Sequence, residues 1–158
     1  MKKITYILFV FASLLLGSCN LMKSEDDKIS DILIGNTYQE DETLENGSKI
    51  TDYRSQYFKD GTYKTSATIQ IYDDESTENV NITFKVTGTW KVKDKFIYYT
   101  YDYDKLKIEP ETWDLLMRDK LIEDLKTKNT PDEILSYDPA KIIYKNSDGE
   151  KRTIKKSY

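Results

Sequence analysis

The chain contains no histidine, and this absence excludes several kinds of functional site. A Ser-His-Asp triad, a Cys-His catalytic pair and a histidine-ligated metal centre all require an imidazole. The chain also has a single cysteine, so it forms no internal disulfide and no cysteine cluster for zinc or iron–sulfur. We therefore expect a protein that is not an enzyme and that holds no cofactor or metal.

Basic residues are too few to give the protein a broadly positive surface. The 158 residues include 24 Lys and Arg against 28 Asp and Glu, a formal net charge of −4. Nucleic-acid-binding domains need a positive face, so we expect no nucleic acid partner. The hydrophobic fraction is 38% and the aromatic fraction 13%, including 13 tyrosines, which is enough for one ordered domain.

The longest apolar run lies at the N-terminus. Met1-Lys2-Lys3 precedes apolar residues from Ile4 to Leu16, and small residues follow. A basic start, an apolar core and small residues before a cleavage site are typical of a secretory signal peptide. The run is shorter than the ~20 residues that a transmembrane helix needs. We predict a signal peptide over residues 1–18 that is cleaved after Ser18.

Leu16-Gly17-Ser18-Cys19 resembles the lipobox of bacterial lipoproteins. In that family the cysteine thiol receives a diacylglycerol and the new N-terminus is usually acylated as well, with chains such as palmitate. The resemblance implies lipid attachment at Cys19 and a membrane anchor in the bacterial cell envelope. Asn20 follows the cysteine where Asp would favour the inner membrane, so the resemblance implies the outer membrane, on its periplasmic or surface face. The alternative is an ordinary signal peptide followed by a buried cysteine.

The residues after the cysteine are polar, with Lys-Ser-Glu-Asp-Asp-Lys at 23–28. Such a composition is typical of a flexible tether between a lipid and a domain. We therefore predict a flexible tether over residues 19–31 and one folded β domain over residues 32–158.

Apolar and polar residues alternate from about Ile34 to Tyr103, which predicts β-strands. The clearest stretch runs from Val80 to Val92, with apolar residues at its even positions. We expect one core to receive five of these side chains: Val80, Ile82, Phe84, Val86 and Trp90. Gly88 is the expected place for a bend.

Turn signals separate the alternating segments. Hairpins are predicted at Asn46-Gly47, Lys59-Asp60-Gly61, Lys93-Asp94-Lys95 and Ser147-Asp148-Gly149, and a longer acidic loop at residues 73–79. This gives about seven strands joined as an antiparallel meander, which favours a mainly β fold, either a small barrel or a strongly curved sheet.

The densest aromatic stretch is Phe-Ile-Tyr-Tyr-Thr-Tyr-Asp-Tyr at residues 96–103. In a strand, Tyr99, Tyr101 and Tyr103 share one face with Ile97. Tyrosine combines an apolar ring with a polar tip, which suits a ligand cavity or a protein interface. Ordinary cross-strand packing is the alternative interpretation. Trp90 and Trp113 are two further candidate ligand or interface residues. In the alternative interpretation, Trp90 closes the core and Trp113 docks the helix on the sheet.

One helical segment interrupts the strand pattern. Pro110-Glu111 begins a run to about Lys128, with Trp113, Leu116 or Met117, Leu121 and Leu125 at helical spacing. We predict one helical insertion near residues 110–128 that lies across the tyrosine face or caps the barrel mouth beside it. Thr-Pro-Asp-Glu at 130–133 fits a capping box, which predicts a second helical turn through Leu135.

Short motifs recur in a recognisable order: Ile-Gly-Asn-Thr-Tyr at 34–38, Asp-Gly-Thr-Tyr at 60–63, Gly-Thr-Trp-Lys-Val at 88–92 and Asp-Gly at 148–149. Over roughly residues 34–154 this order resembles the lipocalin-like domains of small bacterial lipoproteins. The chain departs from their pattern with Tyr38 where a tryptophan is expected, and with the helical insertion. The resemblance implies a small lipocalin-like barrel without catalytic residues.

Two functional hypotheses follow. The first is a lipid-anchored envelope lipoprotein whose lipocalin-like domain binds a small apolar ligand or an envelope protein. The alternative is a periplasmic or surface protein inhibitor or immunity-type lipoprotein, in which the exposed loop at residues 73–79 blocks a basic enzyme with the help of charge steering. An envelope enzyme would have to use carboxylates, tyrosine or a Ser-Lys pair, and no spacing in the chain supports one.

Overall fold

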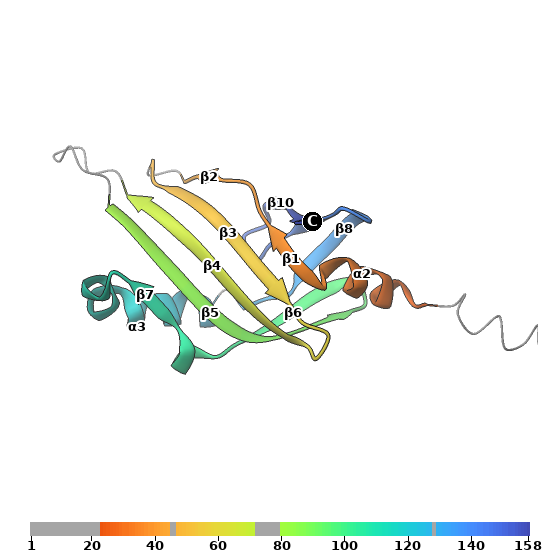
Figure 1. Ribbon diagram of the computed structural model, residues 1–158, viewed down its shortest axis with the longest axis horizontal. Helices are drawn as coiled ribbons and strands as arrows, with labels where there is room; N and C mark the ends of the chain where they lie inside the picture. The colour runs from red at the N-terminus through yellow and green to blue at the C-terminus, as the bar shows by residue number, and fades with distance from the viewer. Residues whose placement is uncertain (1–22, 45–46, 72–79, 128) are drawn as a thin grey trace, which may run out of the picture.

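The computed structural model describes residues 23–44, 47–71, 80–127 and 129–158. Their strands belong to one ten-stranded antiparallel sheet (Figure 1). The strands are β1 (Gly35–Tyr38), β2 (Glu42–Thr43), β3 (Lys49–Tyr57), β4 (Thr62–Ile71), β5 (Val80–Lys93), β6 (Phe96–Tyr101), β7 (Lys107–Glu109), β8 (Asp132–Asp138), β9 (Lys141–Lys145) and β10 (Lys151–Lys156). The helices are α2 (Glu25–Leu33), the short 3-10 helix η1 (Tyr103–Lys105) and α3 (Glu111–Thr127).

Eight of the strands close into a barrel. Neighbours follow the order β1-β10-β9-β8-β6-β5-β4-β3, and β1 also pairs with β3, which completes the ring. In β1, Thr37 lies opposite both Ser55 of β3 and Lys156 of β10. β2 and β7 are short additions beside β3 and β5. The predicted mainly β, antiparallel barrel is therefore confirmed.

The predicted turns join consecutive strands where the structure describes them. Residues 59–61 connect β3 to β4, residues 94–95 connect β5 to β6, and residues 147–149 lie between β9 and β10. Asn46 and the acidic loop at residues 73–79 lie outside the described residues. The predicted strand count of about seven is one short of the barrel, because β8 was predicted as helix.

The long strand β5 changes partner at Gly88. Before this residue β5 pairs with β7, and from Gly88 onward it pairs with β6. A Cβ atom at Gly88 would lie 1.9 Å from the carbonyl oxygen of Thr100, so only glycine fits this close approach.

The predicted even-numbered face of β5 is confirmed, since Ile82, Val86 and Trp90 are buried and the residues between them are more exposed. The expectation of one shared core is wrong. Trp90 belongs to the cluster inside the barrel, whereas Ile82 and Val86 belong to a second cluster under α3. The strand is longer than the barrel wall, so its two halves face different partners.

The predicted flexible tether over residues 19–31 is wrong from Glu25 onward, because this segment is part of α2. Ser24 and Asp27 form a reciprocal capping box, in which the Asp27 amide donates to the Ser24 hydroxyl over 3.1 Å. Ile29 and Leu33, one helical turn apart, are completely buried. The polar residues that suggested a tether form the solvent-facing side of an amphipathic helix.

Helix α2 closes one end of the barrel. Ile29 and Leu33 pack in the same cluster as Trp90 and Ile97. The Asp26 carboxylate accepts hydrogen bonds from the backbone amides of the turn between β5 and β6, over 3.0 and 3.3 Å. These contacts give the barrel an apolar floor, far from α3 at the other end of the molecule (Figure 1).

The predicted helix near residues 110–128 is confirmed as α3. Its Trp113, Met117, Leu121 and Ile122 pack against the second buried cluster, which consists of Ile82, Val86, Leu106 and Ile108. Leu116 is 75% exposed, so Met117 is the member of the apolar stripe at that turn. Arg118 pairs with Asp114 over 2.7 Å and donates to the Leu106 carbonyl over 2.8 Å, which fixes the helix beside β7.

The helical turn expected through Leu135 is wrong, because these residues form strand β8. Asp132 lies opposite Ile97 of β6, and Ile134 is buried opposite Tyr144 of β9. The capping-box pattern is a local signal, and the pairing that completes the barrel overrides it.

Candidate functional site

A cavity of about 200 Å³ lies inside the barrel at the end away from α2. Strands from around the ring and the turn between β9 and β10 contribute to its lining. Six tyrosines line it, namely Tyr53, Tyr57, Tyr63, Tyr99, Tyr101 and Tyr144. An eight-stranded barrel is just wide enough to be filled by side chains or to hold one small ligand. This cavity is the strongest candidate for a functional site.

The tyrosine hydroxyls in the cavity are uncharged hydrogen-bonding groups. The hydroxyls of Tyr57 and Tyr99 lie 3.1 Å apart, and the Tyr144 hydroxyl donates to the Gln39 side-chain oxygen over 3.0 Å. The Tyr63 hydroxyl is buried and has no hydrogen-bond partner among the described residues. Burial raises the pKa of Tyr57, Tyr63 and Tyr99, so their hydroxyls stay protonated at neutral pH.

Two charged side chains, Asp132 and Arg152, are among the residues that line the cavity. Arg152 donates to both carboxylate oxygens of Glu42, one of them over 2.7 Å, and to Glu150 over 2.8 Å. No hydrogen bond from a described residue reaches the Asp132 carboxylate. Burial raises the pKa of Asp132 to about 7, and the Arg152 charge only partly opposes this effect.

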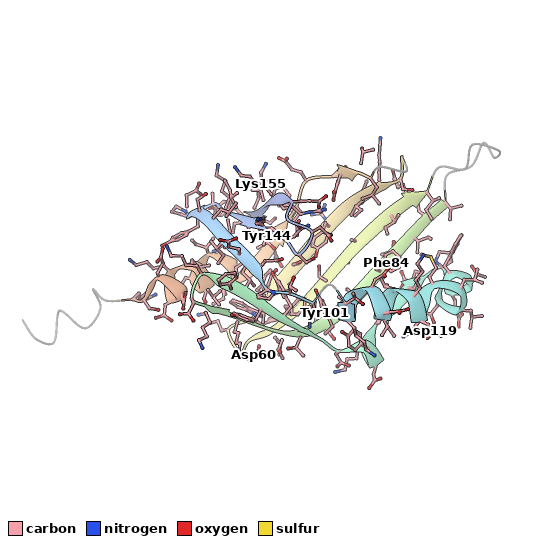
Figure 2. All side chains as sticks on the ribbon, turned by 180° about the vertical axis from the view of Figure 1, so that it is seen from behind. Asp60, Phe84, Tyr101, Asp119, Tyr144 and Lys155 are labelled. Atoms are coloured by element: carbon pink, nitrogen blue, oxygen red, sulfur yellow. The ribbon has the colours of Figure 1, made fainter. Side chains whose placement is uncertain are left out.

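The end of α3 lies at the mouth of the cavity. Leu125, in the last turn of the helix, and Thr130 line the cavity together with Tyr101. The Lys126 ammonium lies 5.3 Å from the centre of the Tyr103 ring, which holds the end of the helix against η1. Figure 2 shows Tyr101 near the end of α3 and Tyr144 across the barrel. Thus α3 packs on the sheet through its earlier turns and contributes Leu125 of its last turn to the cavity lining.

The structure brings two of the predicted aromatic residues into the cavity, Tyr99 and Tyr101. Tyr103 does not share their strand face, because β6 ends at Tyr101 and Tyr103 begins η1. Its ring centre lies 6.2 Å from that of Tyr101. A change of backbone direction after Tyr101, which the alternating pattern does not signal, removes Tyr103 from the ladder.

The two tryptophans are not among the residues that line the cavity, although the ring centre of Trp90 lies 5.2 Å from that of the lining residue Tyr57. The Trp90 indole donates to the carbonyls of Phe58 and Thr62, over 3.3 and 3.0 Å, and its ring belongs to the cluster that α2 closes. Trp113 packs in the cluster beneath α3. Cys19 and Ser18, the predicted lipid-attachment and cleavage residues, lie outside the described residues.

Sequence analysis missed Asp132, Arg152 and Tyr144. Asp132 was interpreted as part of a helix start, although Pro131 before it and Ile134 after it also fit a strand. Arg152 and Tyr144 flank the predicted turn at residues 147–149, and a hairpin register places them opposite each other. That pairing is a signal that was available in the sequence.

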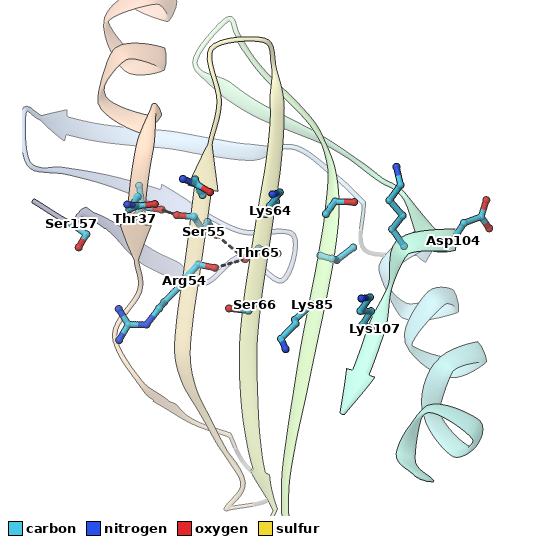
Figure 3. A pocket seen from close by; sticks show the side chains of 15 residues that line it. Thr37, Arg54, Ser55, Lys64, Thr65, Ser66, Lys85, Asp104, Lys107 and Ser157 are labelled. Atoms are coloured by element: carbon cyan, nitrogen blue, oxygen red, sulfur yellow. Dashed lines mark hydrogen bonds between the residues drawn. The ribbon is translucent and has the colours of Figure 1, made fainter. Parts of the chain in front are cut away.

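A larger groove of about 690 Å³ runs across the outside of β3, β4 and β5 (Figure 3). Basic side chains border it, but described acidic groups neutralise most of them. Lys85 pairs with Glu109 over 2.8 Å, and Lys105 pairs with Asp102 over 2.7 Å. The groove is open to solvent and its charges are largely compensated, so the inner cavity is the better candidate site.

Within the described ranges, no group of three or more acidic, histidine or cysteine side chains is arranged to hold a metal ion. None of the described helices is both long enough and apolar enough to cross a membrane.

A family model of known proteins matches the N-terminal part of the chain. The family model described as trans-membrane regulatory protein ToxS matches residues 21–107, more than half of the 158-residue chain. The chain belongs to the ToxS family. The ToxS match covers α2 and β1 to β6, so it includes the barrel floor together with Tyr99 and Tyr101, and it ends before Asp132. No curated protein matches the chain.

Proposed function

We propose that this ToxS-family chain is a lipid-anchored protein of the bacterial cell envelope. In this proposal its lipocalin-like barrel binds a small molecule, and the bound state takes part in membrane regulation without catalysis. The observation that carries the proposal is the cavity of about 200 Å³, lined by tyrosines and placed between an apolar floor and the last turn of α3.

The lining of the cavity supports binding rather than catalysis. Burial raises the pKa of Tyr57 and Tyr99, so their hydroxyls stay protonated and supply no phenolate as a base or nucleophile at neutral pH. The chain has no histidine to activate a hydroxyl. The description of the family as regulatory agrees with a binding role.

The anchor is proposed from the first 22 residues, which precede the described domain. The lipobox at residues 16–19 places a lipid on Cys19, and α2 begins six residues later at Glu25. The family is described as trans-membrane, so retention of the uncleaved leader as the anchor is the competing arrangement. In either case the anchor precedes α2 in the chain, so we expect the floor of the barrel to face the membrane.

The anchor is tested by the mass of the protein extracted from envelope membranes. The proposal expects loss of residues 1–18 and the added mass of acyl chains, both abolished by Cys19→Ala. Ser24→Ala serves as a control that leaves the lipobox intact. An uncleaved, unacylated chain that stays in the membrane would show that the leader itself is the anchor.

Ligand binding is tested by native mass spectrometry of the full-length protein from the same extract. A small molecule should co-purify with the unmodified chain. Leu125→Trp, which places a larger side chain at the cavity mouth, should reduce its occupancy. Glu123→Trp, on the exposed side of the same helix, is the matched control. Equal occupancy in both variants would place the ligand outside the cavity.

A further inference from the structure

The charges and rings of the cavity indicate which class of molecule it binds. We propose that the barrel binds a small organic cation, either an amine or a quaternary ammonium, between the Asp132 carboxylate and the surrounding tyrosine rings. This inference rests on the proposed function, since it names the ligand of the same cavity. It replaces the small apolar ligand expected from the sequence with a charged one.

The cavity contains one carboxylate whose charge no described cation binds directly. Asp132 and Arg152 are the charged residues of the described lining, and Arg152 is bound to Glu42 and Glu150 at the rim. The guanidinium therefore has two carboxylates of its own to neutralise it. An anion entering the cavity would meet the Asp132 carboxylate, whereas a cation would be attracted by it.

Aromatic rings make up much of the cavity lining. The ring centres of Tyr63 and Tyr99 lie 5.4 Å apart and nearly edge to face, and Tyr57 lies 6.0 Å from Tyr63. The faces of aromatic rings attract organic cations, and several rings around one site are the usual device for binding quaternary ammonium groups. The unpartnered Tyr63 hydroxyl also offers an oxygen that can accept a hydrogen bond from an amine. Rings and a carboxylate together suit a cation better than a neutral molecule.

The size of the cavity also suits a small ligand. A cavity of about 200 Å³ is smaller than the ~300–1,000 Å³ typical of sites for drug-sized ligands. Leu125 is part of its lining, and the barrel wall surrounds the rest of it, so a bound cation would be partly removed from water. A buried carboxylate without a hydrogen-bond donor is unfavourable, and a cation bound beside it removes that cost.

The inference predicts a pH dependence, because Asp132 must be ionised to attract the ligand. The groups that interact electrostatically with Asp132 are Arg152 from β10, Tyr53 and Tyr57 from β3, Tyr99 and Tyr101 from β6, and Tyr144 from β9. The tyrosines stay neutral and the arginine stays charged near neutral pH, so Asp132 alone changes its charge there. Because the pKa of Asp132 is about 7, binding of a permanent cation should be about 30-fold weaker at pH 5.5 than at pH 8.

The test is calorimetric titration of the full-length protein in mild detergent with choline. Its neutral carbon isostere, 3,3-dimethylbutan-1-ol, has the same shape without the charge, and butyrate tests an anion. Asp132→Asn removes the charge at constant size. The matched control is Glu133→Gln, which removes a carboxylate from the exposed face of the same strand. Tyr63→Leu removes a ring and leaves the carboxylate, and it provides a second variant if Asp132→Asn does not fold.

The inference expects choline to bind at least tenfold more tightly than its neutral isostere. Asp132→Asn and Tyr63→Leu should each weaken choline binding, Glu133→Gln should not, and binding should weaken as the pH falls. If the neutral isostere or butyrate binds with equal or higher affinity than choline, and Leu125→Trp blocks that binding, the cation inference is wrong. The proposed function would still stand. Absence of binding by all three probes, together with no co-purifying molecule, would overturn both.

Discussion

The Arg152 guanidinium donates to both carboxylate oxygens of Glu42, although it lines the same cavity as Asp132. This pair connects β10 to β2 at the rim, so the positive charge is held at the edge of the cavity. As a result, Asp132 is buried among tyrosines without a hydrogen-bonded partner among the described residues. This distribution of charges is the basis of the proposed binding of a cation beside Asp132.

Asp132→Asn should stabilise the protein at pH 8 and have little effect near pH 4. Burial raises the pKa of this carboxyl from 3.8 to about 7, so the folded state disfavours the ionised form. The stabilising contribution of the protonated group is complete below pH 3.8 and is lost as the pH rises through about 7. The shift corresponds to at most about 4 kcal/mol. Urea denaturation of both proteins across this range measures the effect, and equal stability at every pH would contradict it.

Glu42→Gln should lower the pKa of Asp132. The change removes the carboxylate that holds Arg152 at the rim, so the positive charge acts more strongly on the cavity. At pH 8, where Asp132 is already mostly ionised, cation binding should weaken because the less compensated charge of Arg152 repels the ligand, although Glu42 itself does not line the cavity. Glu40→Gln is the control, because Glu40 is exposed and pairs with Lys155 instead. If Glu40→Gln and Glu42→Gln have the same effect on affinity, the change is a general surface-charge effect.

Leu33→Ala should destabilise the domain by about 2–5 kcal/mol, because it leaves a cavity in the barrel floor. Lys28→Ala, at an exposed position on the same helix, should cost less than about 0.5 kcal/mol. Denaturation midpoints measured by circular dichroism test this pair. If Leu33→Ala leaves the midpoint unchanged, α2 is a tether and does not close the barrel.

Leu121→Ala and Leu116→Ala should differ in their effects on stability. Leu121 packs on the cluster beneath α3, whereas Leu116 is 75% exposed. We expect a loss of about 1–3 kcal/mol for Leu121→Ala and almost none for Leu116→Ala. Thermal denaturation of the two variants measures the difference. The opposite order would mean that α3 packs on the sheet through its other face.

Local patterns predicted the strands, most of the turns and α3, because alternation and helical spacing report directly on which face is buried. The even face of β5 and the turn at residues 59–61 were correct for this reason. α2 was missed because its two buried residues, Ile29 and Leu33, are few beside its polar ones. β8 was missed because a strong local capping pattern competed with a pairing to β6 that is distant in the sequence.

The cavity was only partly predictable. The tyrosines at 99 and 101 were chosen from one dense segment, but the other lining residues come from strands spread over the whole chain. Asp132 and Arg152 line the same cavity because β9 lies between β8 and β10 and pairs with both strands, and β1 then closes the ring between β10 and β3. Burial of Asp132 is likewise a property of the closed barrel, so its raised pKa has no signature in the sequence around it.

The most direct test of the account is an NMR titration of the Asp132 side-chain carboxyl, assigned by comparison with Asp132→Asn, with and without choline. We expect a pKa of about 7 for the Asp132 carboxyl in the free protein. Bound choline should lower that pKa, because the cation favours the ionised carboxylate. An ordinary pKa near 3.8 that does not move when choline is added would contradict both the buried carboxyl and its role in the site.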